Sequence, residues 1–484
     1  MKGVLSKSLF LSFFAFFMVG MGCYLARANT VKHSEEYVVI DNIQLLGNKT
    51  TKDFILIREL PFSLGDTIHT ATFPEQLRLA EENLNNLLLF NYLEITPLPE
   101  VDNPSSITLI IEVEERWYIW PLIEFKLEER NLSAWLQNWD FKKITIEAGA
   151  RIDNFLGLKH KLVVSVHGGY QWGAFLGYRD ISLDKKGTHF LSMDMQWNVS
   201  HNLDIYTSED KPARFNIPDV VLEESLESRI NYSYRPNIRT THIVSFIHQY
   251  IILADTVLQL NPHYWGNDLL NRNAFQLNYR YRSDQRDYHP YPLNGYLIQA
   301  GVNTYITSDA TVRYAQMHLG LQYFKQLALS RWYVSSVFSG AFSFSNTQAF
   351  ILQRAIGYEN NMLRGYEHTV ADGQSFAVLN NTLKYNLMKK KTFTINWLSF
   401  LPKFNKIHFS IYANAHFDVG YAHNNWNERQ NVLSNQWLYA GGVGLDFVTY
   451  YDMVIGIDYS VNKQMRNGFF SWRNFFFSIK VPFI

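Results

Sequence analysis

From residue 117 to residue 484 the chain alternates apolar and polar residues, and this period of two constrains its fold more than any other feature. Residues 275–281, 407–417 and 455–461 each carry apolar side chains at every second position. Successive side chains of a strand point to opposite faces, so each run has one apolar and one polar face. The final run places Phe475, Phe477 and Ile479 on one side. The region is therefore predicted to be a sheet with two different faces.

A soluble β-sandwich has the same period, so composition must separate it from a membrane sheet. Aromatic residues make up 16% of the chain, with 12 Trp, 29 Tyr and 35 Phe, and charged residues only 18%. Aromatic side chains gather at membrane interfaces, and Phe suits a lipid-facing surface. After residue 30 no run of 18 apolar residues occurs, which excludes spanning helices. These features favour a mainly β fold, a closed transmembrane antiparallel β-barrel, over residues 117–484.

Length predicts the number of strands only loosely. At about 23 residues for each strand and its connection, the region holds about sixteen strands, with fourteen to eighteen as the expected range. The sequence ends inside a strand, so both ends of the barrel are expected to face the same side, which requires an even number.

Residues 1–28 have the pattern of a signal peptide: Lys2 and Lys7, an apolar stretch over 9–22, and Ala26-Arg27-Ala28 as a cleavage site. The apolar stretch is too short for a spanning helix, and the residues before Cys23 make a poor lipid-attachment motif. Cys23 is the only cysteine, so the mature chain is expected to lack disulfides and thiolate metal sites. Its compartment is predicted to lie outside the cytoplasm.

Charge and motif content exclude several functions. The chain has 44 basic and 44 acidic residues, so no basic surface points to nucleic acid. It has no G-x-S-x-G elbow, no phosphate loop and no identifiable catalytic pair of carboxylates, and its histidines lack the spacing of zinc ligands. We expect no enzymatic activity, cofactor or metal. An outer-membrane hydrolase would need Ser, His and a carboxylate to meet at one rim.

Residues 36–116 are predicted to form a small α+β unit in the order β-α-α-β-β. The strands are expected at 38–46, 92–98 and 107–113, and the helices at 50–60 and 72–90. This order, with Gly47-Asn48, Arg58-Glu59-Leu60, Gly65-Asp66 and Val113-Glu114-Glu115-Arg116, resembles a POTRA domain, the polypeptide-transport-associated module of outer-membrane assembly proteins. The alternative is an unrelated periplasmic α+β domain.

Two motifs in the second region point to the same superfamily. Leu363-Arg364-Gly365-Tyr366, in a loop-like stretch over 358–372, resembles the V/L-R-G-F/Y motif of the BamA-like outer-membrane assembly superfamily. His416-Phe417-Asp418-Val419-Gly420 resembles its x-x-D-x-G strand motif. The resemblance implies POTRA domains before a barrel, a sixth extracellular loop folded into the lumen, and an arginine of that loop paired with the strand aspartate.

The alternation independently places Asp418 on the polar, inward face. A semi-enclosed guanidinium needs such a carboxylate, which can accept two directed hydrogen bonds. Gly365 would permit a sharp turn, Tyr366 would pack against the wall, and Gly420 would leave room for the loop. Many members carry a second acidic residue where this chain has Thr382. The alternative is a surface loop with an unrelated arginine.

The barrel seam should join the first strand, near 118–125, to the last, 474–484. Pro121 and Pro482 each lack an N–H, which would weaken this seam, and Phe483 adjoins it. The stretch Asp284-Gln285-Arg286-Asp287 with Pro292-Leu293-Asn294-Gly295 also resembles a superfamily motif, although a plain turn explains its second half equally well.

The resemblance implies a protein of the cell outer membrane with its N-terminal domain in the periplasm, which inserts or translocates polypeptides. Its partners would be unfolded outer-membrane or secreted polypeptide clients and outer-membrane lipid, and the resemblance allows periplasmic or lipoprotein accessory subunits. A two-partner-type secretion channel or a passive pore would use the same barrel. The sequence does not identify the client.

Overall fold

The computed structural model describes residues 37–101, 103, 105–127, 144–217, 220–266, 269–328, 330–344, 349–358, 361–396, 400, 402–426, 431–464 and 471–480. The expected signal peptide, 1–28, lies outside these ranges. No helix in the described ranges has the length and apolar character needed to cross a membrane.

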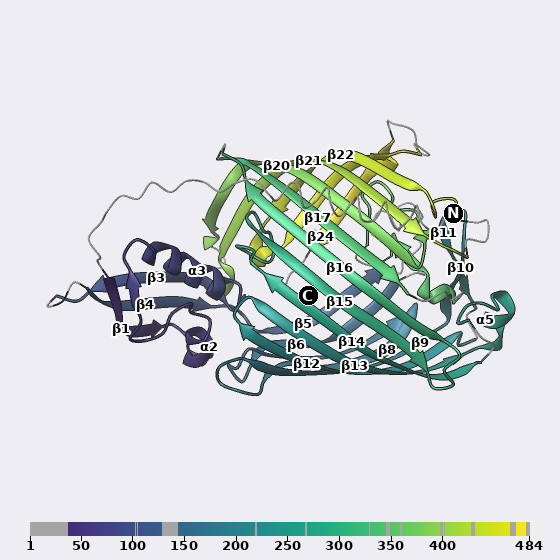
Figure 1. Cartoon of the computed structure of the whole chain (residues 1–484), viewed down its shortest axis with the longest axis horizontal. Helices are drawn as coiled ribbons and strands as arrows, with labels where there is room; N and C mark the ends of the chain where they lie inside the picture. Colours follow the sequence, from purple (N-terminus) through teal and green to yellow (C-terminus); the bar gives the residue numbers. More distant parts are fainter. Residues whose placement is uncertain are drawn as a thin grey trace.

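The N-terminal part is a small sheet covered by two helices (Figure 1). The sheet has the order β2-β1-β4-β3, with β1 and β4 parallel and the other pairs antiparallel. Gly47 ends β1 at φ +90°, and a Cβ there would lie 1.9 Å from the carbonyl oxygen of Val113, so glycine is required. The elements are β1 Tyr37–Leu46, α2 Asp53–Ile57, β2 Thr67–His69, α3 Phe73–Asn85, β3 Phe90–Pro99 and β4 Ser106–Glu115.

Two features of this part differ from the sequence-based expectation. The short strand β2 lies between the helices, and three residues are too few to show a period of two. Tyr118, expected in the first barrel strand, instead enters the core of the small domain. Its hydroxyl donates to the carbonyl oxygen of Leu89 at 3.0 Å and lies 3.2 Å from Thr51 Oγ1.

Most of the rest of the described chain forms one sixteen-stranded antiparallel sheet, which curls into a barrel (Figure 1). Sixteen strands agree with the predicted number. Each strand between β5 and β24 pairs with the barrel strand that precedes it and the one that follows it in sequence. The strands are β5 Ile119–Leu127, β6 Ile144–Phe155, β7 His160–Gly169, β8 Gln171–Ser182, β9 His189–Ser200, β12 Glu223–Asn237, β13 Thr240–Leu253, β14 Asn271–Asp284, β15 Gly295–Thr307, β16 Arg313–Gln326, β17 Trp332–Ser343, β20 Ser375–Thr394, β21 Lys406–His423, β22 Trp437–Val448, β23 Val454–Asn462 and β24 Phe475–Lys480.

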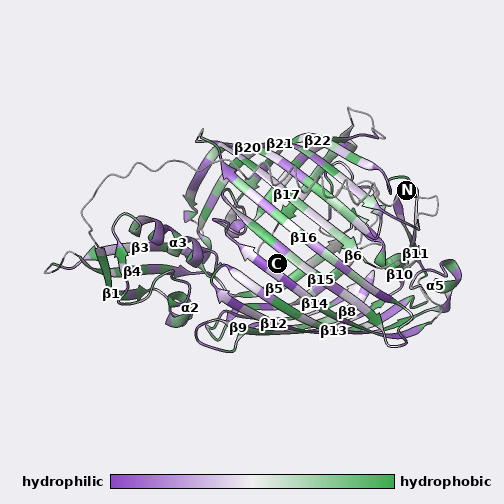
Figure 2. Cartoon of the chain, viewed as in Figure 1, coloured by the Kyte–Doolittle hydropathy of each residue, from purple (hydrophilic) through white to green (hydrophobic). Residues whose placement is uncertain are grey.

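The two faces of the barrel wall have different characters. Apolar and polar residues alternate along the strands (Figure 2). In β24, Phe475, Phe477 and Ile479 are 46%, 41% and 58% exposed on the outside, whereas Phe476 is 7% exposed and contacts His368 inside. An apolar outer face of this kind suits lipid.

The first barrel strand, β5, begins and the last, β24, finishes at the rim of the barrel that carries the small domain. β5 follows that domain directly, and Lys480 of β24 pairs with Val454 beside the β22–β23 turn. The β6–β7 and β8–β9 turns also lie at this end, which we call the near rim. The far end carries the longer connections, with these elements: β10 Asn202–Ser208, β11 Lys211–Asn216, α5 Asp255–Leu260, β18 Arg354–Ile356 and β19 Ala371–Asp372.

Candidate functional site in the barrel lumen

The connection between β17 and β20 folds back into the barrel. Leu363 is fully buried against Ile356 and the inner wall. A Cβ at Gly420 of β21 would lie 3.0 Å from Ile356 Cδ1 and 3.2 Å from Leu363 Cδ2. The small residue at position 420 therefore lets this loop approach the wall closely.

Arg364 projects from the loop onto the wall strand β21. Its Nε donates to Asp418 Oδ2 at 2.7 Å, and its Nη2 donates to Asp418 Oδ1 at 2.6 Å. This fork fixes both the distance and the orientation of the guanidinium. The Asp418 side chain is fully buried, and that of Arg364 is 23% exposed. The two residues that the motifs singled out are therefore in direct contact.

Neutral groups complete the coordination of this ion pair. Arg364 Nη2 also donates to Thr382 Oγ1 at 3.0 Å and to the carbonyl oxygen of Asn381 at 3.3 Å. Asp418 accepts a further bond from Asn380 Nδ2 at 2.9 Å. Thr382 thus contacts the arginine through its hydroxyl, and the site contains one carboxylate rather than two. Sequence reasoning missed Asn380, although it shares the inward parity of Thr382.

Gly365 and Tyr366 continue the loop along the wall. Gly365 has φ +85°, and a Cβ there would lie 2.9 Å from Ala440 Cβ, so both the conformation and the space favour glycine. Its carbonyl oxygen accepts from Asn462 Nδ2 at 2.6 Å. The buried Tyr366 donates through its hydroxyl to Gln464 Oε1 at 2.6 Å. The loop is thereby tied to β23 as well as β21.

The two ends of the loop 358–372 are bonded to each other and to segments at the far end of the barrel. Tyr358 donates to Asp372 Oδ1 at 2.7 Å across the loop. Asp210, at the tip of the β10–β11 hairpin, is fully buried. Its carbonyl oxygen accepts from the N–H of Val370 at 2.8 Å, and its Oδ1 accepts from the N–H of Leu433 at 3.1 Å. Nothing in the local sequence pairs this hairpin with the loop, so the contact was not predicted.

A second polar cluster lies on the same inner face. His416 Nε2 is 2.7 Å from Ser460 Oγ, and Asn414 Nδ2 donates to Asp458 Oδ1 at 3.2 Å and to Asp446 Oδ1 at 3.4 Å. These bonds join β21, β22 and β23. Among the described residues no group of His, Cys, Asp and Glu could hold a metal ion.

The predicted seam is described in part. Pro121 lies in β5 opposite Ala150, and Pro482 and Phe483 lie outside the described residues. Across the described ranges, the backbone ladder ends at β5 on one side and β24 on the other. At the near rim, Trp120 lies edge-on to Tyr451 of the β22–β23 turn with ring centroids 5.2 Å apart, and Arg116 pairs with Asp452 at 2.8 Å. Side chains therefore bridge the start of the first strand to the β22–β23 turn.

The small domain is docked on the near rim through several barrel turns. Glu59 pairs with Arg235 at 2.8 Å, and Glu82 pairs with Arg239 at 2.9 Å. A Cβ at Gly157 of the β6–β7 turn would lie 2.0 Å from the carbonyl oxygen of Thr50, so the backbones touch. Burial lowers the pKa of the nearby Arg58, and the adjacent Glu59 carboxylate opposes this shift.

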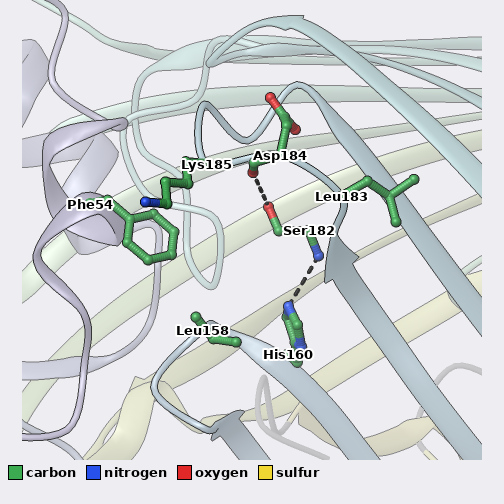
Figure 3. Close-up of a pocket in the computed structure, with 7 residues that line it drawn as sticks. All are labelled: Phe54, Leu158, His160, Ser182, Leu183, Asp184 and Lys185. Atoms are coloured by element: carbon green, nitrogen blue, oxygen red, sulfur yellow. Dashed lines mark hydrogen bonds between the residues drawn. The ribbon is translucent and has the colours of Figure 1, made fainter.

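A small open pocket lies at this junction, between α2 and the β6–β7 and β8–β9 turns (Figure 3). His160 Nε2 accepts from the N–H of Ser182 at 3.1 Å, and Ser182 Oγ donates to the carbonyl oxygen of Asp184 at 3.0 Å. His160 and Ser182 thus already have protein partners. Its lining consists of Phe54, Leu158, His160, Ser182, Leu183, Asp184 and Lys185.

Comparison with known proteins gives a match in fold. No protein-family model matches the chain, and no curated protein sequence matches it. The crystal structure of BamA from Haemophilus ducreyi lacking POTRA domains 1–3 aligns at 12% identity over 91% of this chain and 83% of that one, with a TM-score of 0.51. CdiB from Escherichia coli aligns at 13% identity over 87% of this chain and 72% of that one, with a TM-score of 0.50. The chain therefore has the fold of the BamA-like barrels.

Proposed function

From this fold, we propose that the protein is an outer-membrane barrel with a periplasmic POTRA-like domain, which inserts or translocates polypeptides at the outer membrane. The observation that carries the proposal is the Arg364–Asp418 fork inside a sixteen-stranded barrel of the BamA-like fold. The apolar outer face supports the membrane location. The small domain docked at the near rim would then face the periplasm, where clients arrive unfolded.

The sheet of the small domain offers an edge for a client strand. An extended peptide can add to such an edge through main-chain hydrogen bonds. The edge strand β3 is poorly suited to pair with a client strand, because Pro97 and Pro99 lack an N–H. This strand also contacts the barrel, since Asn91 donates to the carbonyl oxygen of Lys403. The opposite edge carries only the short β2. We assign client capture to β2, with client folding supplying the free energy.

A two-partner-type secretion channel is the second candidate. The described residues contain one POTRA-like unit, which suits a channel with a single client as well as an assembly factor. The two candidates differ in the final location of the client. An assembly factor leaves its client in the bilayer, and a secretion channel releases it beyond the bilayer.

The test is reconstitution of the full chain in lipid vesicles with an unfolded outer-membrane protein as client. Faster folding of the client into the bilayer supports insertion, and protease-protected passage of a soluble client supports secretion. If the full chain shows neither activity, the proposal is overturned.

The client edge is tested with Thr67→Pro against Thr67→Ala. Thr67 of β2 lies opposite Val39 of β1. The next pair, Ile40 and Asp66, is hydrogen-bonded, because the N–H of Ile40 donates to the carbonyl oxygen of Asp66 at 3.0 Å. Pairs alternate between bonded and non-bonded in an antiparallel ladder, so the N–H of Thr67 points away from β1. Proline should block client crosslinking to β2, whereas alanine should preserve it.

A further inference from the structure

The connection between β14 and β15, residues 285–294, enters the lumen from the near rim. The Tyr291 hydroxyl donates to Asp446 Oδ2 at 2.7 Å, and the Tyr291 ring lies 5.0 Å from that of Tyr412. Lys384 Nζ lies 4.0 Å from the centroid of the Tyr291 ring and 3.8 Å from Asp446 Oδ2. One tyrosine therefore contacts inward residues of β20, β21 and β22.

These contacts cross the barrel rather than follow its wall. In the sheet, β15 is separated from β22 by β16, β17, β20 and β21. With neighbouring strands about 4.8 Å apart, five steps along the wall amount to about 24 Å. A side chain cannot span that distance, so the backbone of the turn must lie across the periplasmic end of the lumen.

Hydrogen bonds within the turn 285–294 fix its conformation. Asp287 Oδ1 accepts from the N–H of Leu293 at 3.1 Å, and its Oδ2 accepts from the N–H of Asn294 at 3.0 Å. At its base, Arg286 forms two bonds to Asp284, at 2.8 Å from Nε and 2.7 Å from Nη2. The turn can therefore move as a unit rather than as a loose loop.

The small domain holds this same turn through Asn86, and Arg116 at the end of the domain also hydrogen-bonds Tyr288 of the turn. Asn86, which follows α3, donates from Nδ2 to the carbonyl oxygen of Asp287 at 3.2 Å. Its Oδ1 accepts from the N–H of His289 at 2.9 Å. An amide that binds the backbone on both its donor and its acceptor side fixes the turn relative to the domain.

We propose that turn 285–294 is a strap that couples the position of the small domain to closure of the lumen by Tyr291. In the docked state, Asn86 holds the turn and Tyr291 occupies the space beside Lys384 and Asp446. When the small domain leaves the rim, the turn is released and Tyr291 leaves the lumen. The inference rests on the proposed function, because it names the regulation of the same barrel.

The test is ion conductance of the full chain in planar lipid bilayers, with Asn86→Ala, Tyr291→Ala and the double variant. Asn85→Ala is the matched control, because Asn85 is the adjacent asparagine at the end of α3. Loss of two hydrogen bonds should raise the open fraction about tenfold in Asn86→Ala. Tyr291→Ala should conduct at least as much, and the double variant no more than Tyr291→Ala. Asn85→Ala should match the wild type.

A crosslink keeps the test valid if Asn86→Ala folds poorly. In a chain with Cys23→Ser, the pair Asn86→Cys and His289→Cys should suppress openings when oxidised and restore them when reduced. Wild-type conductance in both Asn86→Ala and Tyr291→Ala, or an oxidised pair that conducts like the reduced one, would overturn the strap. Conductance needs no client, so the strap can fail while vesicle insertion succeeds, and the reverse.

Discussion

The Arg364–Asp418 fork should hold the loop 358–372 inside the barrel, and the two partners should contribute unequally. Arg364→Ala leaves a fully buried carboxylate whose remaining described side-chain donor is Asn380, so we expect a loss near the upper part of about 3 to 5 kcal/mol. Asp418→Ala leaves a guanidinium that is 23% exposed and keeps Thr382 as an acceptor. Its cost should be smaller, about 2 kcal/mol.

A double-mutant cycle measures the coupling directly. Removing both residues leaves neither charge unpaired, so the double variant should be more stable than the sum of the single losses predicts, by about 2 kcal/mol. The measurements are urea unfolding of the barrel in detergent and proteinase K cutting within 358–372. The matched control is Arg179–Asp194, joined at 2.6 Å with an arginine 42% exposed, whose coupling should stay under about 1 kcal/mol.

Additive losses at Arg364 and Asp418, with no gain in loop cutting in either single variant, would refute this reasoning. Equal coupling in the two cycles would show that burial of Asp418 has no energetic consequence.

Three further predictions concern other parts of the molecule. Phe477→Arg should lower the free energy of unfolding by about 2 to 4 kcal/mol if Phe477 lies near the bilayer midplane, and Ser478→Arg, on the inward face, should lower it much less. The measurement is the heat-modifiable gel mobility of the barrel, and an equal loss in the two variants would show that the faces are misassigned. Gly365→Ala should lower the urea midpoint by an amount equivalent to at least about 1 kcal/mol, because its φ is +85° and the new Cβ meets Ala440; an unchanged midpoint would contradict the close approach. Burial and nearby arginines lower the pKa of His289 to about 4 from 6.5, so the unfolded chain binds more protons between these values. Stability should therefore fall as pH falls from 6.5 to 4, and His289→Asn should flatten this part of a thermal-unfolding profile; an identical slope in the variant would disprove the assignment.

The period of two carried most of what could be predicted about the barrel. It placed Asp418 and Gly420 on the inner face, because parity along a strand fixes the face of every side chain. It could not locate Asn462 or Asp210 beside the loop, since these contacts join segments with no shared pattern. Tyr118 shows a second limit: an aromatic residue between two domains fits either core, and only its bonds to Leu89 and Thr51 decide.

The range of the contacts along the chain has a consequence for assembly. Barrel strands pair with their sequence neighbours, so the sheet can grow hairpin by hairpin with little loop-closure entropy at each step. Arg364 meets Asp418 across 54 residues, whereas Arg116 meets Asp452 only across 336. The Arg116–Asp452 pair thus forms only after the β22–β23 turn is in place, whereas Glu59–Arg235 and Glu82–Arg239 need only the β12–β13 turn. A nascent chain that stops before β22 should therefore hold an N-terminal domain that contacts these earlier turns but lacks the tie to Asp452, and so remains more open to the chaperones and proteases of its compartment.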